Sequence, residues 1–271
     1  MPLIQLIVLA LIQGITEFLP VSSSAHLILA PLAVKDWQDQ GALIDVAAHV
    51  GTLFAVIGYF RRETTTLVKG GFDAVRFKPS DDRRLFLLIA AATAPILVIG
   101  GVVAVAGWLD HLRSPVVIGW AFILFGLLLW HGDRQPAVKD NLSQLRWRDA
   151  VVIGAAQVMA IVPGSSRSGV TMTAARYLGW SRTEAARFSM LIAIPTIGAS
   201  GLFAVLSLLS EGASAEIGAA LIVAVLSFLS ALGAIAIFMK LTKTVSFTPF
   251  VIYRLVIGVL LLVYAGSLGS A

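Results

Sequence analysis

The chain has 271 residues, of which 58% are apolar and 13% are charged, and its formal net charge is +5. Soluble domains average about 25% charged residues, so this charge deficit excludes an ordinary soluble protein. The basic residues lie in short connections between apolar runs, which excludes nucleic acid as a partner. Cysteine is absent from the sequence, which excludes disulfide scaffolds and thiolate metal sites.

Long apolar segments predict membrane-spanning helices, because about 20 apolar residues in a helix cross a bilayer. The runs without Asp, Glu, Lys or Arg are 85–109, 114–130, 188–210, 217–239 and 255–271. Together with 42–60, they predict an all-α polytopic membrane protein with six transmembrane helices and membrane lipids as its surroundings.

The charge of the connections predicts the orientation, because basic loops stay in the cytoplasm. Basic residues concentrate in the loops 61–84, 131–149 and 240–243. Few or none occur in the turns 35–41, 110–113 and 211–216. We therefore expect the first group inside and the second outside.

Two interrupted segments, 1–34 and 150–187, are too long for loops and too broken for straight spans. Pro20 and Pro163 each follow an apolar helical run, and proline ends a helix. Serines follow both prolines, and serine favours the start of a new helix. We therefore expect two re-entrant helix pairs, one entering from each side of the membrane.

The similar breaks also predict an inverted internal repeat. Gln13 precedes the first break and Gln157 precedes the second at a similar distance. We expect a single integral membrane domain, 1–271, with repeat one at about 1–131 and repeat two at about 150–271. Broken backbone within a membrane is tolerated only where protein or water surrounds it, so the site should lie between the breaks.

The first break carries an acidic candidate. Gln13 and Glu17 are four residues apart and share a helix face, so Glu17 is expected to be a base or a cation ligand in the cavity. The alternative is a carboxylate exposed at a helix end. His26 lies one turn beyond Ser22 and Ser23, which favours a functional histidine over a structural one.

The second break carries an anion-binding candidate. A helix N-terminus offers free N–H groups, and Arg167 adds a planar fork that suits phosphate. The hydroxyls expected to help bind the substrate belong to Ser165, Ser166, Ser168 and Thr171. The alternative is an arginine that reaches the lipid headgroups, but 150–166 before it is free of charge.

One further pair of polar residues lies on an apolar segment. Asp45 and His49 are four apart, too few for a metal site, and are expected to form a supporting pair or an interfacial anchor.

Segment 13–26, QGITEFLPVSSSAH, and segment 163–171, PGSSRSGVT, resemble the motifs of the undecaprenyl-pyrophosphate phosphatase family, the bacitracin-resistance proteins. The resemblance implies hydrolysis of undecaprenyl diphosphate to undecaprenyl phosphate and phosphate, which recycles the lipid carrier for peptidoglycan and cell-wall synthesis. It implies the bacterial plasma (inner) membrane and a divalent cation, Mg²⁺ or Ca²⁺, with Glu17 as its ligand. Gln13 stands where the family often has Glu, which weakens a two-carboxylate metal site.

We expect Glu17, Ser23, His26 and Arg167 to be catalytic, with Glu17 or His26 activating either Ser23 or water. Gln13, Ser22 and the hydroxyls of the second break would bind the polyprenyl diphosphate lipid. The alternative function is a polyprenyl-phosphate transporter or flippase that uses the same anion site. The site is expected to open to the periplasmic side, and a homodimer and a monomer both remain open.

Overall fold

The computed structural model describes residues 1–34, 37–108, 112–210 and 217–269. Their secondary structure consists of helices, turns and one isolated bridge between Lys139 and Trp180. Of the three turns expected outside the membrane, residues 35–36, residues 110–111 and the whole of 211–216 lie outside the described residues.

Six described helices are long and apolar enough to cross a membrane, as the sequence predicts. They are α3 (Gly41–Tyr59), α5 (Asp81–Val105), α6 (Pro115–Asp133), α9 (Arg182–Ser210), α10 (Ile217–Leu241) and α11 (Thr248–Gly269). This arrangement confirms the all-α class and fits a multi-pass membrane protein.

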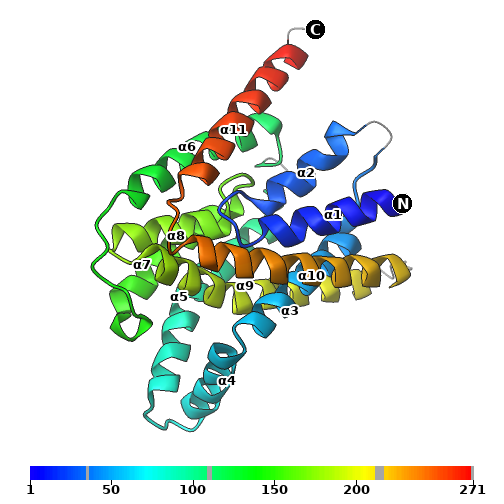
Figure 1. The fold of residues 1–271 in the computed structure, drawn as a ribbon. Helices are drawn as coiled ribbons and strands as arrows, with labels where there is room; N and C mark the ends of the chain where they lie inside the picture. Colours follow the sequence, from blue (N-terminus) through cyan, green and yellow to red (C-terminus); the bar gives the residue numbers. More distant parts are fainter. Residues whose placement is uncertain (35–36, 109–111, 211–216, 270–271) are drawn as a thin grey trace.

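The basic segment 61–84 is not simply a loop, which corrects the expectation from its charge. It contains α4 (Arg61–Val75), which packs on the first turns of α5 and extends with them at the bottom of Figure 1. A Cβ on Gly70 would meet the carbonyl oxygen of Asp82 at 2.1 Å, so the two helices approach backbone to backbone. The helix was not predicted because α4 is amphipathic and its charged face interrupts any long apolar run.

Four shorter helices flank the two predicted breaks. They are α1 (Leu3–Thr16), α2 (Ser23–Ala33), α7 (Trp147–Gln157) and α8 (Arg167–Tyr177), and α7 continues into a 3₁₀ turn, η3 (Val158–Ile161). A second 3₁₀ turn, η2 (Leu142–Gln144), precedes α7. In Figure 1, α1 and α2 lie side by side on the right, and α7 and α8 lie on the left.

The two breaks share an unusual backbone conformation. Ser22 and Ser166, each directly before a new helix, have φ of 72° and 70°. This left-handed region is costly for residues other than glycine and is often held at functional sites. Ser166 caps α8 by accepting a hydrogen bond from the Gly169 N–H, as serine at this position predicts.

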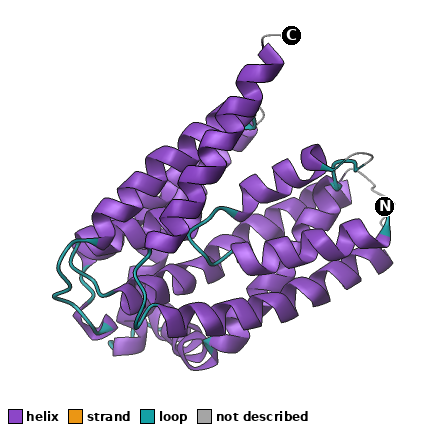
Figure 2. Ribbon diagram, turned by 45° about the horizontal axis from the view of Figure 1, so that its top comes forward, coloured by secondary structure: helices purple, strands orange, loops and turns teal. Residues whose placement is uncertain are grey.

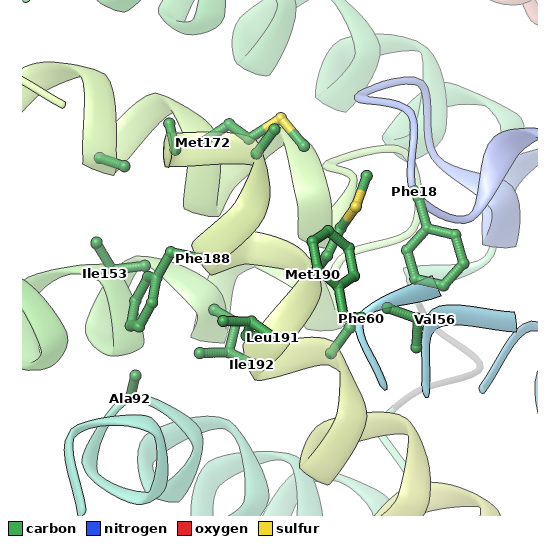
Figure 3. Close-up of a cluster of buried hydrophobic side chains, with 14 of the residues drawn as sticks. Phe18, Val56, Phe60, Ala92, Ile153, Met172, Phe188, Met190, Leu191 and Ile192 are labelled. Carbon is green, nitrogen blue, oxygen red and sulfur yellow. The ribbon is translucent and has the colours of Figure 1, made fainter. Parts of the chain in front are cut away.

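Long-range packing holds the short helices against the spans. Helix α1 packs on α10, α7 packs on α5, and α3 packs on both α9 and α10. Helices α6 and α11 form a long pair, and α11 leads to the C-terminus in Figure 2. The largest apolar core lies where α3, α5, α7, α8 and α9 meet, and it includes the fully buried ring of Phe18 (Figure 3). The core therefore anchors the chain directly after Glu17.

Candidate active site

A cavity of about 590 Å³ lies between the first break, the start of α8, and the facing halves of α5 and α9. Its polar end contains Glu17, the serines of the first break, Ser166 and Arg167. Its remaining wall is largely apolar and includes Leu97 and Phe203. The cavity therefore has a charged end and an apolar wall, which suits a ligand with a charged head and an apolar tail.

Glu17 is the centre of the polar end, where it follows the last turn of α1 and is 8% exposed. Its Oε2 accepts hydrogen bonds from Ser23 Oγ at 2.5 Å and from Gln13 Nε2 at 3.0 Å. Its Oε1 accepts one from Arg167 Nη2 at 3.2 Å. Gln13 lies next to Glu17 because the two residues are one helical turn apart. The tight turn at Pro20 brings Ser23 back to the Glu17 carboxylate.

Arg167 is the first residue of α8, and its side chain is 11% exposed. Its Nη1 donates to the Ser189 carbonyl on α9 at 3.1 Å, so the guanidinium is oriented from two sides. The adjacent cation favours the ionised form of the Glu17 carboxylate despite burial. An anionic side chain, Glu17, and a cationic side chain, Arg167, thus meet in one cavity although they come from opposite halves of the chain.

Direct hydrogen bonds join the two breaks. The Gly164 N–H donates to Ser22 Oγ at 3.1 Å, and Ser168 Oγ donates to the Leu19 carbonyl at 2.8 Å. Gly164 has φ of 93°, and a Cβ there would lie 2.8 Å from the Ile118 carbonyl oxygen, so glycine suits both the conformation and the space. The breaks form one structural unit.

The other predicted site residues have different surroundings. Thr171 Oγ1 is fully buried, donates to carbonyls of its own helix and exchanges a hydrogen bond with Ser189 Oγ at 2.7 Å. Ser165 Oγ donates to the Val162 carbonyl, within the second break. These residues shape the break and do not line the cavity.

His26 also lies away from the cavity lining. Its ring stacks on Tyr253 of α11, with Nε2 at 2.5 Å from the tyrosine hydroxyl, and its Nδ1 contacts the Ser22 carbonyl at 2.7 Å. It faces α6 and α11 rather than the carboxylate of Glu17.

Comparison with known proteins places this arrangement in a family. A family model described as bacitracin resistance protein BacA matches residues 6–260. The chain belongs to the bacitracin resistance protein BacA family. A relative from Maricaulis maris (strain MCS10), named undecaprenyl-diphosphatase, is 48% identical over 97% of this chain and 99% of its own length. Relatives with the same name from Jannaschia sp. (strain CCS1) and Ruegeria pomeroyi (strain ATCC 700808 / DSM 15171 / DSS-3) are 46% and 47% identical, over 98% of this chain and 99% and 100% of their own lengths.

Beside the candidate site of this BacA-family chain lies a buried cation that sequence reasoning missed, Arg254 on α11. The side chain is 0% exposed and donates to the carbonyls of Pro20 at 3.2 Å and Gly164 at 2.8 Å, one in each break. It also donates to the Ala121 and Phe122 carbonyls of α6, each at 3.3 Å. A lone arginine within an apolar run was the available signal.

His49 is closer to the site than its pairing with Asp45 predicts. Its Nδ1 contacts the Asp45 backbone carbonyl at 2.7 Å, while the Asp45 side chain accepts from Gln40 Nε2. The other ring nitrogen lies 3.9 Å from Glu17 Oε2, and His49 lines the cavity. In this BacA-family member, the Asp45 carboxylate is hydrogen-bonded to Gln40, and the His49 imidazole instead contacts its own helix backbone and approaches Glu17.

Proposed function

We propose that this chain is an undecaprenyl-diphosphatase, a membrane hydrolase that converts undecaprenyl diphosphate to undecaprenyl phosphate and phosphate. Relatives of that name cover nearly the whole chain at 46–48% identity. The observation that carries the proposal is the meeting of Glu17, Ser23 and Arg167 at one end of an otherwise apolar cavity. The diphosphate fits the charged end and the polyprenyl tail fits the apolar wall. The product is the lipid carrier used again in cell-wall synthesis.

Ser23 is the proposed nucleophile, because its hydroxyl already donates to a buried carboxylate. Glu17 takes the proton as Ser23 Oγ bonds to the terminal phosphorus. The bond from that phosphorus to the bridging oxygen breaks, and undecaprenyl phosphate leaves with the bond electrons. Glu17 then gives up that proton to solvent and is again a carboxylate. Water attacks the phosphorus of the phosphoserine while Glu17 accepts a proton from it. The bond from phosphorus to Ser23 Oγ breaks, inorganic phosphate leaves, and Glu17 passes the proton to Ser23 Oγ, which restores the free serine.

Arg167 and the N-terminus of α8 stabilise the charge that develops on the phosphoryl oxygens. Phosphoryl transfer depends mainly on positioning and electrostatic stabilisation, and a guanidinium matches the geometry of phosphate oxygens. Ser22 and Ser166 line the same end of the cavity and are proposed as further substrate contacts. His26, Ser165, Ser168 and Thr171 are proposed to support the two breaks from outside the cavity.

A divalent cation, Mg²⁺ or Ca²⁺, fits this donor set together with phosphate oxygens of the substrate. The Glu17 carboxylate is one hard oxygen ligand, and the buried Oε1 of Gln13 beside it has no hydrogen-bond partner. Among the described residues, no three His, Cys, Asp or Glu side chains come together. Mg²⁺ is commonly held by one or two carboxylates plus substrate phosphates. When bound, the cation would neutralise diphosphate charge.

The helix pairs α1–α2 and α7–α8 are proposed to be re-entrant and to belong to inverted repeats at about 1–131 and 150–271. Each half contains a short pair followed by three of the six candidate spans, and the first half has α4 in addition. The packing of α1 on α10 parallels that of α7 on α5, since α5 and α10 take equivalent places in the two halves. The matching φ of Ser22 and Ser166 adds a second correspondence.

The protein is proposed to lie in the bacterial inner membrane with its site open to the periplasm. With basic connections inside, α5 and α9 both run outward. Residues of their later halves, such as Gly101 and Phe203, line the cavity, which supports an outward opening. A homodimer is compatible with this arrangement and is left to measurement.

The decisive experiment is phosphate release from undecaprenyl diphosphate by purified protein in detergent. Wild-type protein should release phosphate, and Arg167→Ala should lower turnover by at least about 10²-fold, the usual cost of losing one preorganised donor. Arg61→Ala, which removes an exposed arginine of α4, is the matched control and should retain wild-type turnover. Lipid transfer between leaflets without phosphate release would contradict the enzyme and favour the carrier.

A further inference from the structure

A second polar cavity, of about 650 Å³, lies away from the candidate active site. Four membrane spans meet there: α6 ends at Asp133, α10 ends at Leu241, α9 begins at Arg182 and α11 begins at Thr248. Because all four are span ends, the cavity lies at the level where lipid headgroups meet water. The predicted orientation places it on the cytoplasmic side.

The cavity is strongly cationic. Its described lining includes Arg134, Arg176, Arg182 and Lys243 against one carboxylate, that of Asp133. Arg182 neutralises this carboxylate through Nε at 2.6 Å and Nη2 at 3.1 Å. The remaining cations therefore leave an excess of positive charge that no described carboxylate of the lining offsets.

Several of the donors are available to a ligand. The guanidinium of Arg134 stacks on Trp130 at 3.5 Å from the ring centroid. Neither this guanidinium nor the Lys243 ammonium makes a hydrogen bond or ion pair with any described residue, and both side chains are exposed. The Arg182 contacts to Asp133 involve two of its three nitrogens, which leaves Nη1 free to donate.

The backbone adds to this preference for anions. The starts of α9 and α11 contribute helix N-termini, which favour negative charge, and Ser181 and Ser246 place hydroxyls beside them. Arg176 is 3% exposed and donates to the carbonyls of Asp133 and Gln135, where α6 ends. It thereby offsets carbonyl dipoles that would otherwise repel an anion.

We propose that this cavity is a second anion site that binds a phosphate group, supplied either by an anionic phospholipid headgroup or by free phosphate. Basic pockets between helix ends on the cytoplasmic side are suited to anionic headgroups. Basic residues that served only to set the membrane orientation would point separately into water. These basic side chains instead line one cavity, in which Arg182 pairs with the carboxylate of Asp133 and hydrogen bonds orient Arg176. The site differs in residues and position from the one that carries Glu17 and Arg167.

The test compares the thermal unfolding of wild-type protein with two double variants, in detergent. Arg134→Gln/Lys243→Gln removes the two free cations of the cavity. Arg61→Gln/Arg62→Gln removes the same charge from an exposed part of α4 and is the matched control. Each protein is titrated with phosphatidylglycerol, with phosphatidylcholine and with inorganic phosphate, because a ligand that binds the folded state raises Tm.

Phosphatidylglycerol or inorganic phosphate should raise Tm equally in wild-type and control proteins, with an apparent affinity at least about tenfold weaker in the cavity variant. A loss confined to the lipid arm identifies a headgroup site, and a loss in the phosphate arm identifies a free-anion site. Phosphate bound at the active site does not confound the comparison, since neither variant alters that site. Equal titrations in all three proteins, or an equal effect of phosphatidylcholine, would overturn the proposal.

Discussion

Among single residues, one position in the first break separates the proposed nucleophile, Ser23, from its neighbour Ser24. Ser23 is 7% exposed and donates to Glu17, whereas Ser24 is exposed and contacts only the Ser22 hydroxyl, at 3.3 Å. Both serines line the cavity. The hydrogen bond to Glu17 therefore favours Ser23 over Ser24 as the proposed nucleophile, because a hydroxyl needs a general base within hydrogen-bond reach.

We predict that Ser23→Ala abolishes phosphate release, with a loss of at least about 10³-fold, since removal of a nucleophile leaves only binding and electrostatic effects. Ser24→Ala should stay within about twofold of wild-type protein, because Ser24 contacts neither Glu17 nor Arg167. Both are measured by phosphate release with undecaprenyl diphosphate. Equal activities of the two variants would show that water, not Ser23, attacks the phosphorus.

Arg254 of α11 links the two breaks. It donates to one carbonyl in each break and to two on α6. Its removal leaves the Pro20 and Gly164 carbonyls without a donor, whereas the α6 carbonyls keep their helix hydrogen bonds. Each buried acceptor left unpaired costs about 1–3 kcal/mol. We predict that Arg254→Met lowers the Tm and the turnover together.

Arg254→Lys is the conservative comparison. It should recover part of the stability, because an ammonium keeps the charge but cannot reach all four carbonyls at once. Thermal unfolding and phosphate release, measured on the same preparations, check both variants. A fully stable and active Arg254→Met protein would refute a positioning role for this arginine.

At the scale of helices, small residues set how closely the spans pack. A Cβ on Gly51 of α3 would lie 2.2 Å from the Ala224 carbonyl oxygen of α10, whereas nothing lies within 4 Å of one on Gly58. Small residues at helix contacts let backbones approach in membranes. The α3–α10 contact thus holds in place the helix that carries His49.

We predict that Gly51→Ala lowers the free energy of unfolding by about 1–3 kcal/mol, because the added methyl group forces α3 away from α10. Gly58→Ala, in the same helix, should leave stability unchanged or slightly higher. The measurement is thermal unfolding of both variants in one detergent. Equal Tm values would mean that α3 and α10 pack less closely than described.

For the whole molecule, the expected orientation rests on the distribution of charge, and it would decide from which side the proposed substrate reaches the site. The chain has no cysteine, so single introduced cysteines report their side of the membrane without background. Gln38 and Ser143 are both exposed and lie in connections expected on opposite sides. Their labelling therefore tests the orientation directly.

We predict that a membrane-impermeant thiol reagent labels Gln38→Cys in intact cells, because the turn before α3 is expected outside. Ser143→Cys should be labelled only after the cells are opened. Labelling is read from the mass of the purified protein. The reverse pattern would invert the topology and place the cavity opening in the cytoplasm.

The class, the spans, the breaks and the two motifs could be predicted from the sequence, because these depend on local hydrophobicity, proline geometry and charge. The sequence also predicted the pairing of Gln13 with Glu17, which one helix period fixes. It could not detect α4 as a helix, since a charged amphipathic segment resembles a loop when only apolar runs are counted.

Which polar residues share a site depends on the packing of the helices and could not be predicted from the sequence. Helix periodicity puts His26 one turn from Ser22, yet the packing of α2 against α6 and α11 directs its ring to Tyr253. His49 and Arg254 reach the site from distant helices, and Arg167 meets Glu17 across 150 positions of sequence. Such contacts depend on how the helices pack in three dimensions, and local sequence patterns do not show which distant residues the packing brings together.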